Sequence, residues 1–299
     1  MNGPSAVAGP SPERTPARSP HPYHGRTGVL ATLHDKLPLI APAMLDAVGL
    51  EVRDVPVDTD QLGTFSGDVP RPGSPWETVV AKARLAMNAA GNPLGLASEG
   101  SIGPPPDLAF VVAAVELVVV VDDELGIVVG ETSVGYDIVT IAADVTPDDD
   151  IDGLLQRGRF PGHGMIVRPA AGPPALLHKG IHDRSLLDRA IRRCAAASPD
   201  RRAHLETDLR AHHCPSRRPI IAAAAVRLAH RLATRCPTCA TPGWGIVRIE
   251  LGLPCRLCGR VVQVPYADVY GCAACTSERT LGRPGSDGAD PGRCQWCNP

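Results

Sequence analysis

The sequence predicts an α/β protein with a mixed sheet and flanking helices, followed by a small C-terminal zinc-ribbon module. Two observations lead to this prediction. Strand-like and helix-like segments alternate over residues 27–97, as they do in parallel α/β folds. Further along, eight cysteines form four Cys-x-x-Cys pairs between residues 236 and 297. We therefore expect a disordered tail at 1–25, an α/β domain at 26–234 and a zinc module at 235–299.

Helix signals locate the elements of the first half. Apolar residues recur with helical spacing over residues 36–48, and Gly49 follows as a typical C-cap. A second helix is expected to begin after Ser74, because Pro75 suits its first turn and Glu77 stands where a capping box needs an acid. The strands that alternate with these helices are expected at residues 27–32, 50–55 and 94–97.

The apolar segments that follow predict a hairpin and no membrane span. Residues 108–121 and 125–129 are apolar, and three acidic residues stand in the turn between them. The longer segment contains Glu116 and is too short to cross a bilayer. Further strands are expected at residues 138–141 and 165–167, and helices at residues 183–197 and 219–233.

Charge is divided unevenly along the chain. Residues 27–150 carry 5 Lys and Arg against 20 Asp and Glu, whereas residues 151–235 carry 16 against 6. Either the two segments attract each other within one fold, or carboxylates and arginines line opposite walls of a cleft, for a metal and for phosphates. A nucleic-acid partner for the basic segment is a third interpretation.

The cysteine pairs predict two structural zinc sites. With no secretory signal in view, metal binding in the cytoplasm is expected rather than disulfides. The pairs are Cys236/Cys239, Cys255/Cys258, Cys272/Cys275 and Cys294/Cys297. They can combine sequentially, interleaved or nested, and we favour the sequential arrangement because it closes short loops on both sites. A shell of four thiolates leaves no open position for a substrate, so catalysis at zinc is not expected.

Three polar loops of the first half are candidate sites for a phosphorylated ligand. Lys36 lies at a helix N-terminus after the first strand, where it can meet a phosphate. The next loop begins with Asp58 and Asp60 and offers carboxylates, hydroxyls and backbone amides. Ser98 and Glu99 follow the third strand, where a carboxylate can help to hold Mg²⁺. The first loop is also compatible with a solvated lysine beside a turn histidine, and the second with a turn-rich linker.

A fourth polar cluster lies in the basic half, at residues 206–212, and contains Asp208 and His212. On a helix, Glu206 and Arg210 would be four residues apart and would simply form an ion pair.

Four ordered motifs make the chain similar to an uncharacterised bacterial family, a domain of unknown function. The family pattern contains DTD-x-LGTFSGE, ASEGSFGPHP and ETDMRAH-x-NPTRM, and ends in a zinc module with paired cysteines. The corresponding segments here are DTDQLGTFSGD at 58–68, ASEGSIGPPP at 97–106 and ETDLRAHHCPSRR at 206–218. The sequence departs from the pattern at Leu37, Asp68, Pro105 and Cys214. The resemblance implies the architecture but supplies no activity. The family pattern has a histidine where this chain has Pro105, so if that histidine is essential, this chain is a weakened or altered member.

The order of elements also resembles that of house-cleaning nucleoside triphosphate pyrophosphatases. In these enzymes a lysine after the first strand binds phosphate, a later helix reads E-x4-K-A, and an acidic residue follows the next strand. Here the lysine is Lys36, the helix motif is the segment from Glu77 to Ala83, and the acidic residue is Glu99. The lysine loop is one residue shorter here, and the DDSG sequence typical of many such enzymes is absent.

This second resemblance implies a Mg²⁺-dependent hydrolase of a nucleotide or another phosphorylated small molecule. Substrate would be bound by Lys36, Lys82, Ser98, Arg210 and His212. The catalytic carboxylates would be Asp58, Asp60, Glu99 and Asp208, and Mg²⁺ would be held by Glu77 and Glu99. The alternative is a protein without catalysis, whose zinc module and basic segment bind nucleic acid or a protein partner. The sequence determines neither the substrate nor the oligomeric state.

Overall fold

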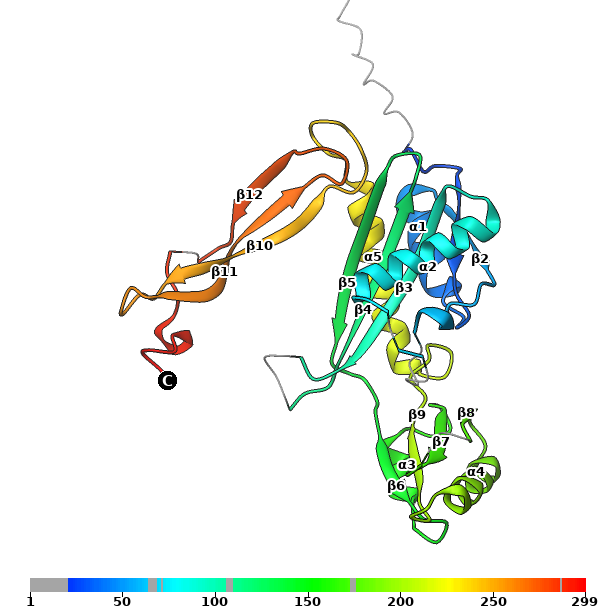
Figure 1. Ribbon diagram of the computed structural model, residues 1–299. Helices are drawn as coiled ribbons and strands as arrows, with labels where there is room; N and C mark the ends of the chain where they lie inside the picture. The colour runs from blue at the N-terminus through cyan, green and yellow to red at the C-terminus, as the bar shows by residue number, and fades with distance from the viewer. Residues whose placement is uncertain (1–20, 64–68, 71, 106–109, 173–175, 286) are drawn as a thin grey trace, which may run out of the picture.

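The strands of the chain form three separate sheets, shown in Figure 1. They are seen in a computed structural model that describes residues 21–63, 69–70, 72–105, 110–172, 176–285 and 287–299. The first sheet carries the main core, the second lies beside one end of it, and the third forms a C-terminal arm. Within these described ranges, none of the helices has both the length and the apolar character needed to span a bilayer.

The first sheet has five strands and mixed directions, as the sequence predicts. Its strands are β1 (Thr27–Ala31), β2 (Glu51–Val55), β3 (Leu94–Gly103), β4 (Ala113–Asp122) and β5 (Ile127–Gly135). Their spatial order is β2-β1-β3-β4-β5. Strand β1 is parallel to both β2 and β3, whereas β3, β4 and β5 are antiparallel to their neighbours. The predicted alternation and the predicted hairpin are therefore both confirmed.

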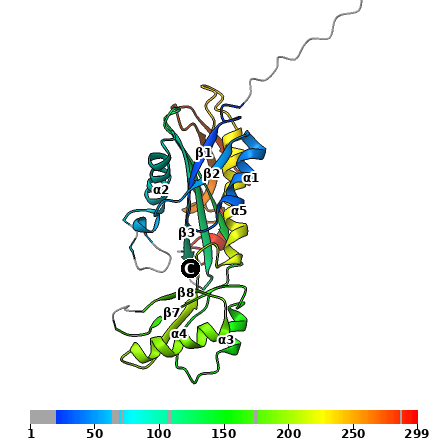
Figure 2. The same cartoon turned by 90° about the vertical axis from the view of Figure 1, so that its right-hand side faces the viewer.

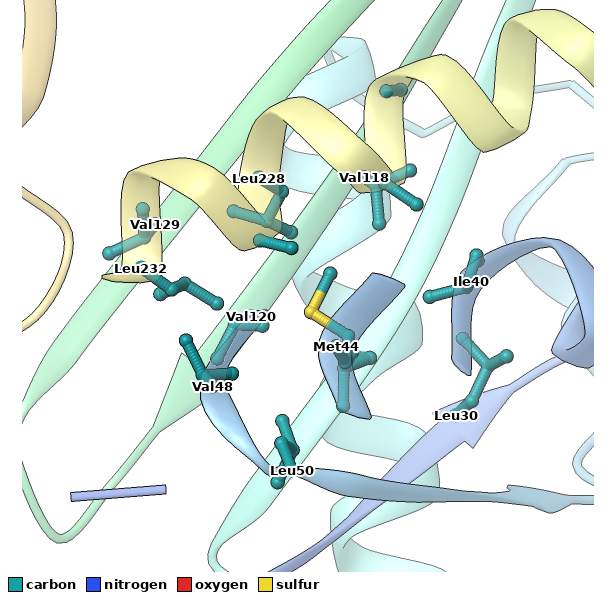
Figure 3. Close-up of a cluster of buried hydrophobic side chains, with 14 of the residues drawn as sticks. Leu30, Ile40, Met44, Val48, Leu50, Val118, Val120, Val129, Leu228 and Leu232 are labelled. Atoms are coloured by element: carbon teal, nitrogen blue, oxygen red, sulfur yellow. The ribbon is translucent and has the colours of Figure 1, made fainter. Parts of the chain in front are cut away.

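Helices cover both faces of this sheet. Helices α1 (Leu37–Val48) and α5 (Arg218–Ala233) pack on one face, and α2 (Pro75–Ala90) packs on the other, as Figure 2 shows. Alternate residues of β4 therefore point into different cores. Val118 and Val120 pack with Met44 and Leu228 on the α1 and α5 face (Figure 3), whereas Val119 packs on the α2 face. Burial on both faces explains why β4 is apolar apart from Glu116 and Asp122.

The predicted helix boundaries are confirmed in detail. Gly49 ends α1 with a left-handed φ of 69°, a conformation that glycine adopts without strain. Ser74 caps α2 by accepting a hydrogen bond from the Glu77 amide, and the Glu77 carboxylate accepts one from the Ser74 amide. These signals are local, so the sequence alone could place them.

The second sheet was not predicted as a separate unit. It contains β6 (Ala142–Val145), β7 (Met165–Pro169), β8 (His178–Ile181) and β9 (Ala203–Thr207), in the order β6-β9-β7-β8. Helix α4 (Arg184–Ala197) packs on it, and α3 (Asp152–Arg157) precedes β7. This lobe, residues 136–216, has its own core around Met165, Leu187 and Leu205. The prediction of a strand at 138–141 is wrong, because the strand begins at Ala142. A strand of four or five residues carries too short a hydrophobic pattern for its position to be located exactly from the sequence.

The third sheet forms the arm that projects from the core in Figure 1. Its antiparallel strands are β10 (Gly245–Pro254), β11 (Val261–Gly271) and β12 (Glu278–Gly282). The remaining short helices are η1 (Asp60–Leu62), η2 (Pro215–Arg217) and η3 (Pro291–Arg293).

The expected N-terminal tail reaches too far into the chain. Residues 1–20 lie outside the described residues, but residues 21–25 form a turn. Tyr23 is fully buried there, in the same core as Val118 and Leu228. The ordered fold therefore begins before residue 26.

Candidate functional site

The eight paired cysteines form two compact sets of four. The first set is Cys236, Cys239, Cys272 and Cys275, and the second is Cys255, Cys258, Cys294 and Cys297. In each set the sulfur atoms all lie within 4.8 Å of one another. The pairs therefore interleave, and the sequential arrangement favoured from the sequence is wrong.

Strand direction explains the interleaved pairing. The first cysteine pair precedes β10, and the second lies in the turn between β10 and β11. Because β10 is 10 residues long, these two pairs stand at opposite ends of a strand that spans roughly 30 Å. Strand β11 returns the chain to the starting end, where the third pair meets the first, and β12 leads back toward the second pair. The sequential prediction was based on loop length alone and did not take the length and direction of the strands into account.

The donor atoms of both sets suit zinc. Four sulfur ligands at close quarters match the tetrahedral thiolate shell of structural zinc sites. Backbone amides also point at the sulfurs: Thr238 N lies 3.4 Å from Cys236 Sγ, and Leu257 N lies 3.4 Å from Cys255 Sγ. Such amides stabilise the negative charge of a thiolate. The arm has only a small apolar cluster around Leu253, so two bound ions would contribute much of its stability.

A pocket of about 340 Å³ opens at the carboxyl end of β1. Its lining comes from the loop after β1, from Asp60 in η1, from Lys82 in α2, and from Ser98 and Glu99 in β3. The pairing of β3 with β1 ends at Ala97, so the next residues of β3 extend past the end of β1 and form one wall. Ligands commonly bind at this edge of α/β sheets.

Lys36 forms part of the floor of this pocket. It is only 8% exposed, and its Nζ donates a hydrogen bond to Ser98 Oγ at 2.9 Å. Burial, followed by the charge of the nearby Arg217 guanidinium, lowers the pKa of Lys36 to about 8. An ammonium group held in a low-dielectric site is a strong attractor for an anionic ligand.

Lys82 and Glu99 form an ion pair in the wall of the pocket. Lys82 Nζ lies 2.6 Å from Glu99 Oε2, and the two side chains are 11% and 6% exposed. The pair brings a cation and a carboxylate to the same side of the site as Ser98. The pocket thus contains two lysines, a hydroxyl and two carboxylates that sequence analysis had selected separately.

A buried ion pair lies behind this wall. Arg217 and Glu116 are both fully buried, with Nε to Oε1 at 2.7 Å and Nη2 to Oε2 at 3.0 Å. Arg217 Nη1 also donates to the carbonyl oxygen of Leu209. A Cβ atom on Gly100 would lie 2.5 Å from Nη2 and 2.6 Å from Oε2, so only glycine lets β3 pass this pair. The pair therefore joins the 97–106 segment to the 206–218 segment.

Sequence analysis missed the partnership of Arg217 and Glu116, although it contained a signal. An acid within an apolar strand must find a partner, because an unpaired buried charge is very unfavourable. The partner of Glu116 could not be chosen from sequence, since 101 residues separate it from Arg217.

Two histidines connect the pocket with the second lobe. His34 lines the pocket, and its ring stacks on that of His212 with centroids 5.0 Å apart and an interplanar angle of 11°. Burial, followed by the charge of Lys36, lowers the pKa of His34 to about 3. His34 is therefore neutral at physiological pH, and it was not among the residues selected from the sequence.

The other predicted site residues lie outside the pocket lining. Asp58 is exposed and accepts a hydrogen bond from the Asp60 amide at 3.0 Å. Asp208 is buried, binds Arg210 at 2.6 Å and accepts a hydrogen bond from the Gly180 amide in the second lobe. Glu77 caps α2 through Ser74, as described above, and does not reach the pocket.

The four positions at which this sequence differs from the expected motif pattern have different structural contexts. Cys214 is buried, with its Sγ 3.5 Å from Ser216 Oγ, and Pro105 is half-buried after β3. Leu37 is the first residue of α1. Asp68 and the adjoining part of the 58–68 segment lie outside the described residues.

Comparison with known proteins identifies a family for this chain but no activity. A search of curated proteins gave no significant match. The model of the family described as "Domain of unknown function (DUF6671)" matches residues 82–299, a range that contains Lys82, Glu99, Arg217 and all eight paired cysteines. The chain therefore belongs to this family of unknown function.

Proposed function

We propose that the protein is a metal-dependent hydrolase that cleaves a phosphoanhydride bond in a nucleotide or another phosphorylated small molecule. One observation carries this proposal: Lys36, Lys82, Ser98, Glu99 and Asp60 line a single pocket. Cations for phosphate and carboxylates for a hard metal ion are the groups that such chemistry requires.

The lysines and the serine account for phosphate binding. Lys36 and Lys82 each present an ammonium group to the pocket, and Ser98 adds a hydroxyl. The pocket also lies beside the N-terminus of α1, and the positive end of the helix dipole favours an anion there. A phosphoryl group is therefore held from several directions, and its charge is largely neutralised before any bond is broken.

Glu99 and Asp60 are the residues that would hold a divalent cation. Mg²⁺ commonly binds through one or two carboxylates and completes its shell with water and substrate phosphates. In the described part of the chain, the two cysteine sets are the only groups of three or more metal-ligating side chains. A cation would therefore bind together with the phosphorylated ligand, and it would polarise the phosphoryl oxygens and lower the pKa of a bound water.

The Lys82 and Glu99 pair gives the pocket a resting arrangement. Without ligand, each side chain neutralises the other at 2.6 Å. When a substrate phosphate binds the Lys82 ammonium, the Glu99 carboxylate can turn to a cation or to the attacking water. Substrate binding would therefore also place the carboxylate that the reaction needs.

Turnover by the purified full-length chain tests the proposal. Nucleoside triphosphates and diphosphates are incubated with Mg²⁺, Mn²⁺ or EDTA, and released phosphate and pyrophosphate are measured. We expect Glu99→Gln to lower turnover about 100-fold, the usual scale for losing a catalytic or metal-binding carboxylate. Lys36→Met should chiefly weaken substrate binding.

Arg84→Met is the matched control for a lost cation. Arg84 is on α2 near Lys82 in sequence, but it is half exposed and binds Asp123 at 3.0 Å. Turnover should be unchanged in this variant. Nucleotide binding without turnover by the wild type would replace the hydrolase with a binding protein, and absence of both would reject the pocket as a phosphate site.

A further inference from the structure

A second groove, of about 390 Å³, lies in the second lobe between β8 and α4. In the order β6-β9-β7-β8, strand β8 has a neighbour on one side only among the strands that the structure describes. Helix α4 packs beside it and forms the other wall. An edge strand next to a helix is the arrangement in which several domains add an extended peptide as a further strand.

The floor of this groove is apolar. Leu177 and Ile181 come from the β8 segment, and Leu186 and Ala190 come from the first half of α4. Leu186 is 50% exposed. On α4, Leu186, Ala190 and Arg193 follow at helical spacing and so lie on one face.

The rim of the groove is cationic. Lys179 projects from β8, and Arg189 and Arg193 project from α4. Arg189 and Arg193 are exposed, and Arg189 contacts the Ser185 hydroxyl at 3.4 Å. In the ranges that the structure covers, no Asp or Glu lines this groove. Its charge therefore selects an anionic partner.

We propose that this groove binds an extended acidic segment of a partner protein as an additional strand beside β8. Every second side chain of such a segment faces α4. Among these side chains, apolar ones would cover Leu186 and Ala190, and carboxylates would meet Arg189 and Arg193 at the rim. A mixture of apolar and acidic residues on that one face therefore satisfies floor and rim together.

The composition of the groove favours a peptide over a nucleic acid. Single-stranded nucleic acids are usually held by aromatic rings on which the bases stack, together with cations. Apart from the cations at the rim, the described lining contains aliphatic side chains and one histidine, His178, but no Phe, Tyr or Trp. The inference does not depend on the proposed hydrolase activity, because none of these residues lines the phosphate pocket.

Fluorescence anisotropy with the full-length protein tests the inference. The probe is a short labelled peptide in which Val and Glu share the positions of one strand face, with Ser between them, and the comparison probes are a matching Val and Lys peptide and a labelled oligo-dT strand. We expect the Val and Glu peptide to bind best. The double substitution Arg189→Glu and Arg193→Glu should weaken it at least tenfold, and Leu186→Ser should weaken it severalfold. N-methylation of alternate peptide amides should also weaken binding, because it removes strand pairing.

Arg192→Glu is the control. Arg192 is exposed on the same helix but does not line the groove, so this variant should bind the Val and Glu peptide as the wild type does. Equal loss in the control would mean general charge attraction and would overturn the site. Preference for oligo-dT would overturn the class of partner, and no peptide binding at millimolar concentration would overturn the proposal itself.

Discussion

The buried pair of Arg217 and Glu116 allows a sharp test of how the pocket is supported. Both side chains are fully buried and share two hydrogen bonds, at 2.7 and 3.0 Å. We consider Arg217→Met, which keeps an unbranched apolar chain but removes the charge and the donors. The substitution leaves the Glu116 carboxylate without its partner and the Leu209 carbonyl without its donor.

The expected loss of stability is large. Removing one partner of a buried ion pair destabilises a protein by about 3–5 kcal/mol, since the remaining charge stays buried and uncompensated. Replacing both partners, as Glu116→Gln with Arg217→Met, should recover part of the loss because no uncompensated charge remains.

Urea denaturation followed by circular dichroism measures these changes. The wild type, both single variants and the double variant form a double-mutant cycle, whose interaction term reports the pair itself. Loss of less than about 1 kcal/mol in Arg217→Met would show that the carboxylate is solvated, and would refute the buried pair. A double variant as unstable as the sum of the singles would show that the two side chains act independently.

Three further predictions follow from the site. Cys239→Ala combined with Cys272→Ala should leave one bound zinc by mass spectrometry, because both belong to one set; sequential pairing would disrupt both sites. Affinity for sulfate, measured by calorimetry, should fall as pH rises through about 8 and this fall should vanish in Lys36→Met, because the folded pKa of Lys36 lies near 8 and the amine is neutral above it. The contribution of Lys36 to the free energy of unfolding has the opposite pH trend. Burial of its charged amine is fully unfavourable below pH 8, and this cost decreases as pH rises from 8 toward 10.5, the ordinary pKa of lysine. Gly100→Ala should lower the free energy of unfolding by about 1–3 kcal/mol, because its Cβ would lie 2.5 Å from Arg217 Nη2.

Local signals made much of the first sheet predictable. Gly49 ends α1 and Ser74 begins α2 where the sequence places them, because a cap depends on a few neighbouring residues. The convergence of Lys36 with Ser98 was also within reach, since β1 and β3 are parallel neighbours and their carboxyl ends share one edge.

Features that depend on the path of the chain were not predictable in the same way. The zinc sets follow from the directions of three strands, whereas the cysteine spacing is compatible with every pairing. The separate second sheet follows from strands of four or five residues, whose patterns are too short to identify. Asp208 and Arg210 stand close in sequence to His212, yet they bind each other and leave only His212 to reach His34.

The 97–106 and 206–218 segments combine two roles that residue type alone does not separate. In the 97–106 segment, Ser98 and Glu99 line the pocket, whereas Gly100 has no side chain because Arg217 and Glu116 occupy that space. The 206–218 segment supplies Arg217, which binds Glu116, and the Leu209 carbonyl, which accepts a hydrogen bond from Arg217. We call this set of contacts the Arg217 clamp. Loss of this clamp should therefore shift the wall that holds Glu99 against Lys82, so Arg217→Met should lower both stability and phosphate binding. Glu99→Gln should reduce turnover while Lys36 and Lys82 still bind phosphate, and that contrast separates the support of the pocket from its chemistry.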